Sequence, residues 1–269
     1  MFAVVRRYPL ATFVVLNMVF LGLGWALLGG QLPMTPLLAA LVVVPIIGGK
    51  AGLRAWASRI VRWRVGVQWY AAAILIPFIG GAIAAFLNVR LGASYTPIEW
   101  SDLPPLIPEA IFIFLLIALG EEPGFRGFAI PQLQKRFSAV NSALILSAIG
   151  VVWHIPLFLT DDSPWNVIPL IVFGYFIFVW LFNNTNGSVL LAMILHTSQN
   201  ILAAKLIQPM FSGSDVTQYI WLFGLVYAVF VAAILLTYRN RYLLVEAAKS
   251  PVNIVEPSLP LMPEAVPPG

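Results

Sequence analysis

Eight long stretches of apolar residues constrain the fold of this chain more than any other feature of its sequence. They lie near residues 11–30, 35–49, 67–88, 106–122, 139–160, 165–183, 187–205 and 216–238. Such stretches cross the roughly 30 Å hydrocarbon core of a bilayer as helices. Only 10% of the 269 residues are charged, whereas an average soluble domain has about 25%. The sequence therefore predicts an all-α fold, a polytopic bundle of about eight transmembrane helices, and so a multi-pass integral protein of the cell membrane.

Basic residues collect in loops on one side of the predicted membrane. The main clusters, in chain order, are Arg6 and Arg7; Lys50, Arg54, Arg59, Arg62 and Arg64; Arg126, Lys135 and Arg136; and Arg239 and Arg241. By the positive-inside rule this side is cytoplasmic, and we expect both termini there. The net charge is only +4 and is spread over these loops, so we expect membrane lipids as partners and no nucleic acid.

The chain divides into four predicted parts. Residues 1–104 would hold spans one to three and a basic amphipathic cytoplasmic loop, residues 50–64, that lies along the membrane surface. Residues 105–205, with spans four to seven, form the expected functional core, and residues 206–249 form the last transmembrane helix. Residues 250–269 contain six prolines and are expected to be a disordered cytoplasmic tail.

Five ionisable residues within or at the end of predicted spans are the strongest functional signal. Placing such a residue in the hydrocarbon region costs about 2.5–3.5 kcal/mol, so each one suggests a function. Glu121, Glu122 and Arg126 stand at the end of span four, His154 in span five and His196 in span seven. The chain has no cysteine, which excludes thiol nucleophiles and cysteine-ligated metals. The residue types present bind metal, move protons or activate water.

Distance from a turn predicts that two of these residues meet. Glu121 and His154 are equally far from the turn expected between spans four and five, so two antiparallel helices would bring them to the same depth. This expectation requires the helix of span four to continue to that turn, although Pro123 and Pro131 could distort it.

Helical spacing pairs the remaining polar residues. His196 and Asn200 are four residues apart and therefore share one helix face, and Glu122 and Arg126 have the same spacing. Glu121 lies about 100° around the helix from Glu122, so it cannot share that pairing equally well. We therefore assign Glu122 to an ion pair with Arg126 and leave Glu121 available for chemistry.

Each feature alone has a simpler structural explanation. A Glu/Arg pair at a helix end often caps the helix or sets its topology, a membrane histidine is often a hydrogen-bonded core residue, and Asn200 alone would join two helices. A carboxylate at the depth of one histidine, together with a second histidine beside an asparagine, is hard to explain as four independent packing choices. The combination favours a functional site.

Three motifs, taken in order, give the chain a family resemblance. EEPGFR (Glu121 to Arg126) matches an EExxxR motif, WHIP (Trp153 to Pro156) supplies the histidine of a second motif, and HTSQN (His196 to Asn200) matches HxxxN. In that order, each on its own hydrophobic span, they resemble the motifs of the CAAX protease and bacteriocin-processing family, or Abi family, of intramembrane endopeptidases. This family includes the CAAX prenyl endopeptidases of the Ras-converting type. The resemblance covers about residues 105–205.

One position departs from the family's pattern. The second motif usually has an aromatic residue four positions before its histidine, and this chain has Gly150 there. An aromatic residue at that position would pack in the wall of the site. We expect Trp153, the neighbour of His154, to fill part of the space.

The resemblance implies an endopeptidase that cuts a membrane-associated or lipidated peptide or protein near the cytoplasmic face. Peptide hydrolysis requires an activated water, a group that stabilises the oxyanion and a proton donor for the leaving amine. We expect Glu121 and His154 to activate the water. His196 and Asn200 would stabilise the oxyanion, as is proposed for the family's prenyl endopeptidases, and the predicted ion pair would support Glu121.

Three alternatives remain open. Glu121, His154 and His196 could instead hold a catalytic zinc ion, since two histidines and a carboxylate form a known ligand set; we favour metal-free chemistry because the sequence has no HExxH motif. The chain could be a non-catalytic immunity or scaffold protein of the membrane. It could also be a proton-coupled transporter, although transporters often have two related halves and here the polar residues lie in one.

Overall fold

The structure, a computed structural model, describes residues 2–238. Within that range it contains helices and no strand, and eight helices are long and apolar enough to cross a membrane, which confirms the predicted fold class. The eight are Pro9–Leu28 (α2), Thr35–Ile60 (α3), Val67–Arg90 (α4), Trp100–Gln134, Ala139–Leu159 (α8), Trp165–Asn184, Val189–Met210 and Ser214–Thr237 (α11). A short helix, α1 (Phe2–Arg7), precedes them. The predicted tail, residues 250–269, lies outside the described residues, and the cytoplasmic placement of the termini stays a prediction.

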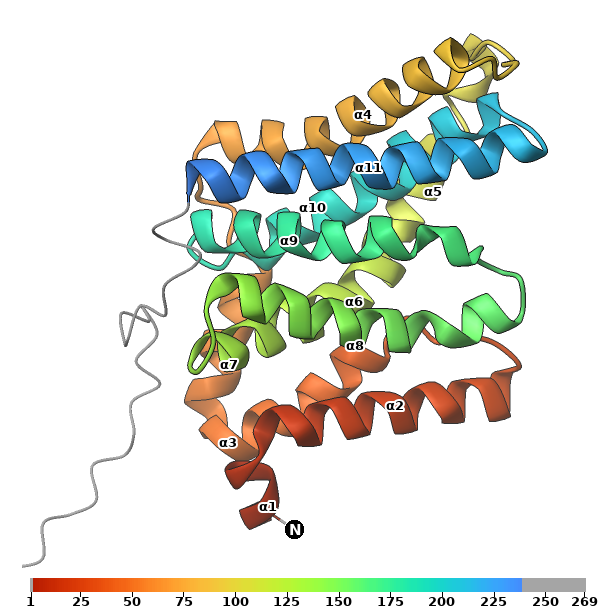
Figure 1. Ribbon diagram of the computed structural model, residues 1–269. Coiled ribbons are helices and arrows are strands. Elements are labelled where there is room, and N and C mark those ends of the chain that lie inside the picture. The colour runs from red at the N-terminus through yellow and green to blue at the C-terminus, as the bar shows by residue number, and fades with distance from the viewer. Residues whose placement is uncertain (1, 239–269) are drawn as a thin grey trace, which may run out of the picture.

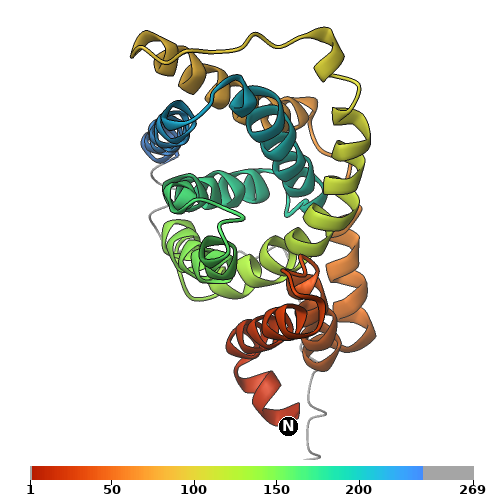
Figure 2. The ribbon, with the colours of Figure 1, turned by 90° about the vertical axis from the view of Figure 1, so that its right-hand side faces the viewer.

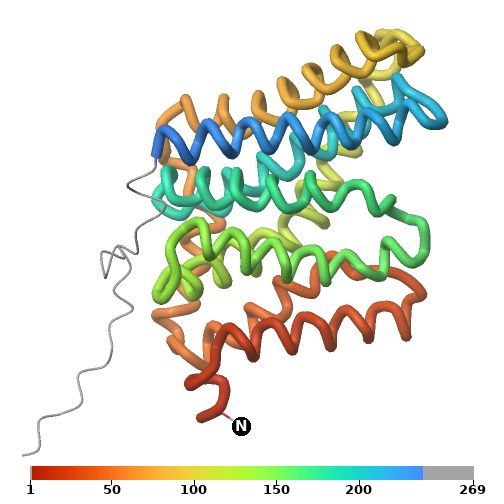
Figure 3. The backbone as a smooth tube through the Cα atoms, viewed as in Figure 1, coloured from red at the N-terminus to blue at the C-terminus, as the bar shows by residue number. Residues whose placement is uncertain are grey.

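Five helices run side by side, and the others cross them. In Figures 1 and 3 the order is α4, α11, α9 (Ile168–Asn184), α8 and α2, and neighbours in this order contact each other. Helices α3, α10 (Val189–Ser198) and the long fourth span cross this row obliquely, as the turned view of Figure 2 shows. The crossing helices bring the motifs of spans four and seven against each other.

The fourth span is a continuous helix that extends well past residue 122. It consists of α5 (Leu106–Phe112), α6 (Leu119–Gly124) and α7 (Ile130–Gln134), joined by two π-helical segments, Ile113–Ala118 and Phe125–Ala129. The helix passes through both Pro123 and Pro131, which lack the amide hydrogen that a helix needs. Local π-helical turns are one way in which membrane helices adjust around proline. The continuity that the depth argument requires is therefore present.

Helix α3 packs closely on α6 because two glycines of α6 face it. A Cβ atom added to Gly120 would lie 2.9 Å from the carbonyl oxygen of Pro33. One added to Gly124 would lie 2.6 Å from Cβ of Pro36 and closer still to its carbonyl group. Small residues four apart are the usual means by which membrane helices approach each other closely. The segment GEEPG therefore both carries the glutamates and forms a helix-packing surface.

Helix α3 bends at Gly49, where the predicted second span ends. Gly49 has φ 56° and ψ −154°, a backbone conformation that favours glycine. After the bend the helix continues to Ile60, and Trp56 and Arg59 are both buried. Burial of Trp56 agrees with the predicted apolar face of the basic loop. Burial of Arg59 does not, because the arginines were expected on the opposite, polar face.

Replacing Gly124 with alanine tests the close packing of α3 on α6. We expect Gly124→Ala to lower the free energy of unfolding by about 1–3 kcal/mol, because the added methyl group meets the Pro36 backbone and forces the helices apart. Gly22→Ala in α2 is the matched control, since nothing lies within 4 Å of its added Cβ atom. The thermal unfolding midpoint of the purified protein in detergent micelles measures both. Equal midpoints for the two variants would contradict the packing argument.

Candidate active site

The site begins with two adjacent carboxylates on α6, inside the helical bundle. Glu121 is 7% exposed and Glu122 is fully buried. A buried charge is strongly unfavourable unless it is paired and hydrogen-bonded. The partners of each carboxylate therefore decide what the site can do.

Glu122 forms the ion pair with Arg126 that their spacing predicts. Nε of Arg126 lies 3.1 Å from Oε2 of Glu122, and Nη1 donates to Oε1 at 3.2 Å. The guanidinium carbon also lies 3.9 Å from the ring centroid of Phe178 and 4.2 Å from that of Tyr175, both on α9. A desolvated cation over an aromatic face gains about 2 kcal/mol or more. Arg126 is thus held from two sides.

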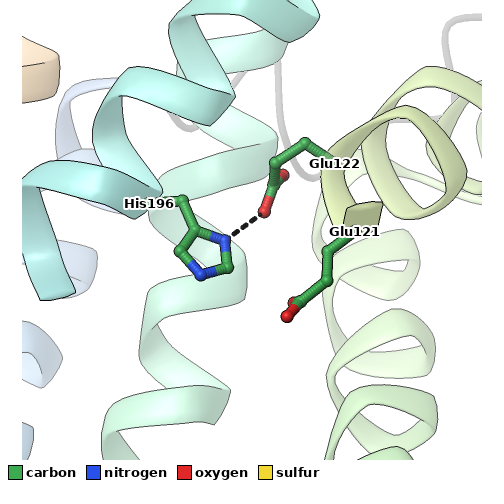
Figure 4. Close-up of side chains that lie close together, drawn as sticks. All are labelled: Glu121, Glu122 and His196. Carbon is green, nitrogen blue, oxygen red and sulfur yellow. Dashed lines mark hydrogen bonds and ion pairs between the residues drawn. The ribbon is translucent and has the colours of Figure 1, made fainter. Parts of the chain in front are cut away.

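Glu122 has a second partner that the spacing argument does not reveal. Nδ1 of His196, on α10, lies 2.7 Å from Oε1 of Glu122 (Figure 4). Because a carboxylate only accepts, Nδ1 carries the proton of this hydrogen bond. The Nε2 atom is then left for chemistry. The carboxylate fixes the ring orientation and tautomer of His196, much as the acid of a hydrolase triad orients its histidine.

Glu121 stands beside this pair without a partner of its own. Within residues 2–238 its carboxylate forms no hydrogen bond or ion pair. One ligand-type atom from each of Glu121, Glu122 and His196 lies within 4.8 Å of the others. In Figure 4 the Glu121 carboxylate lies beside the His196 ring, below the Glu122–His196 hydrogen bond in this view. A carboxylate without a partner and an oriented imidazole ring therefore lie close together.

His154 approaches from α8 and is held by its own helix. Its Nδ1 donates to the carbonyl oxygen of Gly150 at 2.7 Å, which leaves Nε2 free in the neutral ring. The ring is partly buried and packs edge-on against Trp153, which itself packs against Phe125 of the motif helix. In the described part of the chain no hydrogen bond joins it to Glu121. Their direct meeting stays a prediction.

Asn200 lies just beyond His196, where the helix changes its geometry. Helix α10 ends at Ser198 and continues as a π-helical segment, Gln199–Ile207. Segments of this kind occur frequently at functional sites, and the EExxxR motif also runs from α-helix into π-helix at Phe125. Asn200 is partly buried, and the role expected for it stays a prediction.

Two residues of α3 support the motif helix, and sequence reasoning missed both. Nε1 of Trp56 donates to the carbonyl of Pro123 at 3.0 Å, and Nη1 of Arg59 donates to the carbonyl of Gly127 at 2.8 Å. Gly127 stands four residues before Pro131, so its carbonyl lacks the usual helical donor. Arg59 supplies the missing donor. The sequence signal was an arginine at helical spacing from Trp56, which we interpreted only as part of a basic loop on the membrane surface.

The space beside Gly150 is filled by Tyr175, so the expectation for Trp153 is wrong. The three atoms nearest to a Cβ built on Gly150 all belong to Tyr175. Trp153 instead packs edge-on against Phe125, with ring centroids 5.8 Å apart, and its Nε1 donates to Oγ1 of Thr35 at 3.0 Å. Trp153 thus joins α8 to the start of α3.

The residues that could hold a metal differ from the predicted set. We expected Glu121, His154 and His196, whereas the atoms within 4.8 Å of one another come from Glu121, Glu122 and His196. In this group the Glu122 carboxylate is already engaged by Arg126 and by Nδ1 of His196. A metal could use Nε2 of His196 and the Glu121 carboxylate, but it would share Glu122 with a cation. The donor set therefore fits a zinc ion only in part.

Comparison with known proteins supports the resemblance seen in the motifs. Residues 103–202 match the family described as type II CAAX prenyl endopeptidase Rce1-like. A protein of Methanococcus maripaludis named CAAX prenyl protease 2 is 28% identical over 142 residues, which are 47% of this chain and 47% of that protein. The chain thus spans about half the length of the curated relative that it matches. The matched segment contains all three motifs, so the predicted resemblance is confirmed.

A pair of substitutions tests whether Arg59 compensates for Pro131. We expect Arg59→Met to lower the free energy of unfolding by about 1.5–3 kcal/mol, because the buried Gly127 carbonyl loses its donor. The loss should be smaller in a Pro131→Ala background, where the restored amide can bond within the helix. Arg54→Met, at an exposed position of the same helix, is the control. Thermal unfolding in detergent measures the wild type and all four variants, and equal losses in both backgrounds would contradict this role of Arg59.

Proposed function

We propose that this protein is an intramembrane endopeptidase that hydrolyses a peptide bond with a water molecule activated by Glu121. One observation carries the proposal: a carboxylate with no partner borders the same space as a histidine whose ring is fixed by a second carboxylate. A carboxylate that is already paired is a poor base, and an unoriented histidine is a poor donor. In this cluster Glu121 remains unpaired and can act as the base, whereas Glu122 is paired and orients His196.

The proposed reaction moves one proton through Glu121. The carboxylate takes a proton from water while the water oxygen attacks the carbonyl carbon of the substrate. The carbon–nitrogen bond then breaks, and the leaving amine receives the proton from Glu121. Nε2 of His154 accepts a hydrogen bond from the same water, which its free lone pair permits because Nδ1 donates to Gly150.

His196 and Asn200 stabilise the negative charge that develops on the carbonyl oxygen. Nε2 of the protonated His196 ring donates to this oxygen, while Nδ1 of the ring keeps its hydrogen bond to Glu122. The Asn200 amide, one helical turn along, supplies a second donor. Glu122 and Arg126 act in this scheme by orienting His196, in addition to the support expected for Glu121.

We propose a membrane-associated or lipidated peptide or protein as the substrate. A site inside a bundle of eight candidate membrane spans reaches peptide bonds only in chains that lie in or at the membrane. The positive-inside rule places the basic loop after α7 on the cytoplasmic side, so the cut would fall near that face. The Methanococcus maripaludis relative is named a prenyl protease. The test below therefore compares substrates with and without a prenyl chain.

A zinc-dependent version of the same reaction is the second candidate, because three ligand-type groups lie together. When bound, zinc would polarise the carbonyl oxygen and activate water. Nε2 of His196 and the Glu121 carboxylate would hold it, with His154 as the third ligand expected from sequence. We favour the metal-free reaction because Arg126 already neutralises Glu122, and a divalent ion would add positive charge beside it.

Changing Glu121 or Glu122 to glutamine should have different effects on activity and stability. Glu121→Gln is expected to reduce kcat/KM by about 10²–10⁴ with the unfolding midpoint unchanged, because Glu121 has no partner to lose. Glu122→Gln is expected to lower both activity and stability, since Arg126 would remain buried beside a neutral group; breaking such pairs typically costs about 3–5 kcal/mol. The assay uses membrane peptides with and without a prenyl chain.

Glu109→Gln provides the matched control on the same span. Glu109 lies on α5, is 34% exposed, and pairs with Lys205 at 2.8 Å away from the cluster. It should retain wild-type cleavage. Activity that survives in Glu121→Gln would contradict the proposed base. A wild-type protein that cleaves none of the peptides would favour the non-catalytic interpretation.

Metal analysis separates the two candidate mechanisms. We expect purified protein to contain much less than one zinc ion per chain and to retain cleavage after dialysis against a chelator. Stoichiometric zinc whose removal abolishes cleavage, and whose return restores it, would overturn the metal-free assignment. In that case zinc content of Glu122→Ala and His154→Ala would show which ligand set is correct.

A further inference from the structure

Tyr175 of α9 occupies space that is open only because residue 150 of α8 is glycine. A Cβ atom on Gly150 would lie 2.7 Å from Cε2 of Tyr175 and closer still to its Cζ and hydroxyl oxygen. The phenol is a rigid ring rather than a flexible chain end, so it could not yield without moving as a whole. Even alanine at position 150 would therefore displace the Tyr175 ring.

The backbone gives no reason for glycine at position 150. The described glycines with positive φ are Gly29, Gly49, Gly92, Gly187 and Gly213. Gly150 lies within the regular helix α8, where glycine is about 1 kcal/mol less favourable than alanine. A glycine kept inside a helix usually has a packing or functional reason. Here the reason is the phenol ring of Tyr175.

Tyr175 uses this space to face the charged cluster. It is 5% exposed, its ring lies 4.2 Å from the guanidinium carbon of Arg126, and it packs edge-on against Phe125. The ring is thus part of the wall that fixes Arg126, and Arg126 in turn holds Glu122.

We propose that Tyr175 is a positioning residue of the active site and that Gly150 serves to admit it. The ring face fixes Arg126, Arg126 fixes the Glu122 carboxylate, and Glu122 orients His196. This inference deepens the proposed function and rests on it. Tyr175 acts through Arg126 and is not assigned a contact with substrate.

The arrangement also links the two histidine-bearing helices. The Gly150 carbonyl accepts the hydrogen bond that holds His154, and the Gly150 Cα borders Tyr175. His196 is reached from the same tyrosine through Arg126 and Glu122. One ring on α9 therefore borders both the helix position that holds His154 and the arginine that leads through Glu122 to His196.

A double-mutant cycle tests the inference. Gly150→Ala and Tyr175→Ala should each lower kcat by about a hundredfold, the size expected for a misplaced catalytic group, with much smaller changes in KM. The double variant should be no worse than Tyr175→Ala alone, because the methyl group added at position 150 then meets no ring. Gly174→Ala, next to Tyr175 on α9, is the control, since its added Cβ has only ordinary contacts at 3.9 Å.

Two further measurements separate positioning from general damage to the fold. Tyr175→Phe removes the hydroxyl but keeps the ring over Arg126, so it should retain most of the activity. The chain has two histidines, so ¹⁵N-histidine labelling gives an NMR spectrum in which a His196→Ala variant identifies the His196 signals. Those signals should shift in Gly150→Ala and in Tyr175→Ala and remain in place in Tyr175→Phe and Gly174→Ala.

Two results would overturn the inference: losses of kcat that multiply in the double variant, or His196 signals that match the wild type in both Gly150→Ala and Tyr175→Ala. The NMR comparison needs no substrate. If the wild type cleaves no peptide, the proposed function fails, while the His196 signals still decide whether Tyr175 positions that ring.

Discussion

The fully buried carboxylate of Glu122 is the constraint on which the rest of the site depends. A charge without water needs partners, and Glu122 has two, Arg126 one turn along its own helix and His196 on α10. Each partner must then be held in turn. The guanidinium of Arg126 lies over the rings of Tyr175 and Phe178, and His196 is fixed through Nδ1. The partners of one buried charge thus come from the motif helix, α9 and α10, and they fix which residues these helices present to one another.

The N-terminal helices contribute to the site more than their lack of ionisable groups within the bilayer suggests. Pro131 removes the helical donor of the Gly127 carbonyl, and Arg59 of α3 replaces it, while Trp56 of α3 donates to the carbonyl of Pro123. The start of α3 approaches α6 closely because Gly120 and Gly124 have no side chains, and Gly127 leaves room for the Trp56 ring in the same way. Helix α3 therefore supports the helix that carries the glutamates, although α3 itself contains none of the three motifs.

The spans and the contacts within one helix could be predicted, but contacts between helices could not. Apolar length located the spans, and the four-residue spacing found the Glu122–Arg126 pair. The Glu122–His196 bond joins residues 74 positions apart and depends on how α6 and α10 cross, which no spacing rule supplies. Tyr175 was missed because the search followed ionisable groups, and span six has none. The available signal was Gly150, an unexplained glycine in the middle of a helix.

The charges of the cluster suit a reaction that transfers a single proton. Arg126 balances Glu122, so Glu121 and His196 remain as the two groups whose charges depend on one proton each. With Glu121 ionised and His196 protonated, the four residues together carry no net charge, which an enclosed site of low dielectric favours. Taking a proton from water adds a positive charge at Glu121 at the moment when a negative oxyanion forms beside His196. The net charge is therefore conserved within the enclosed space throughout the proposed step, and no ion has to enter or leave to complete it.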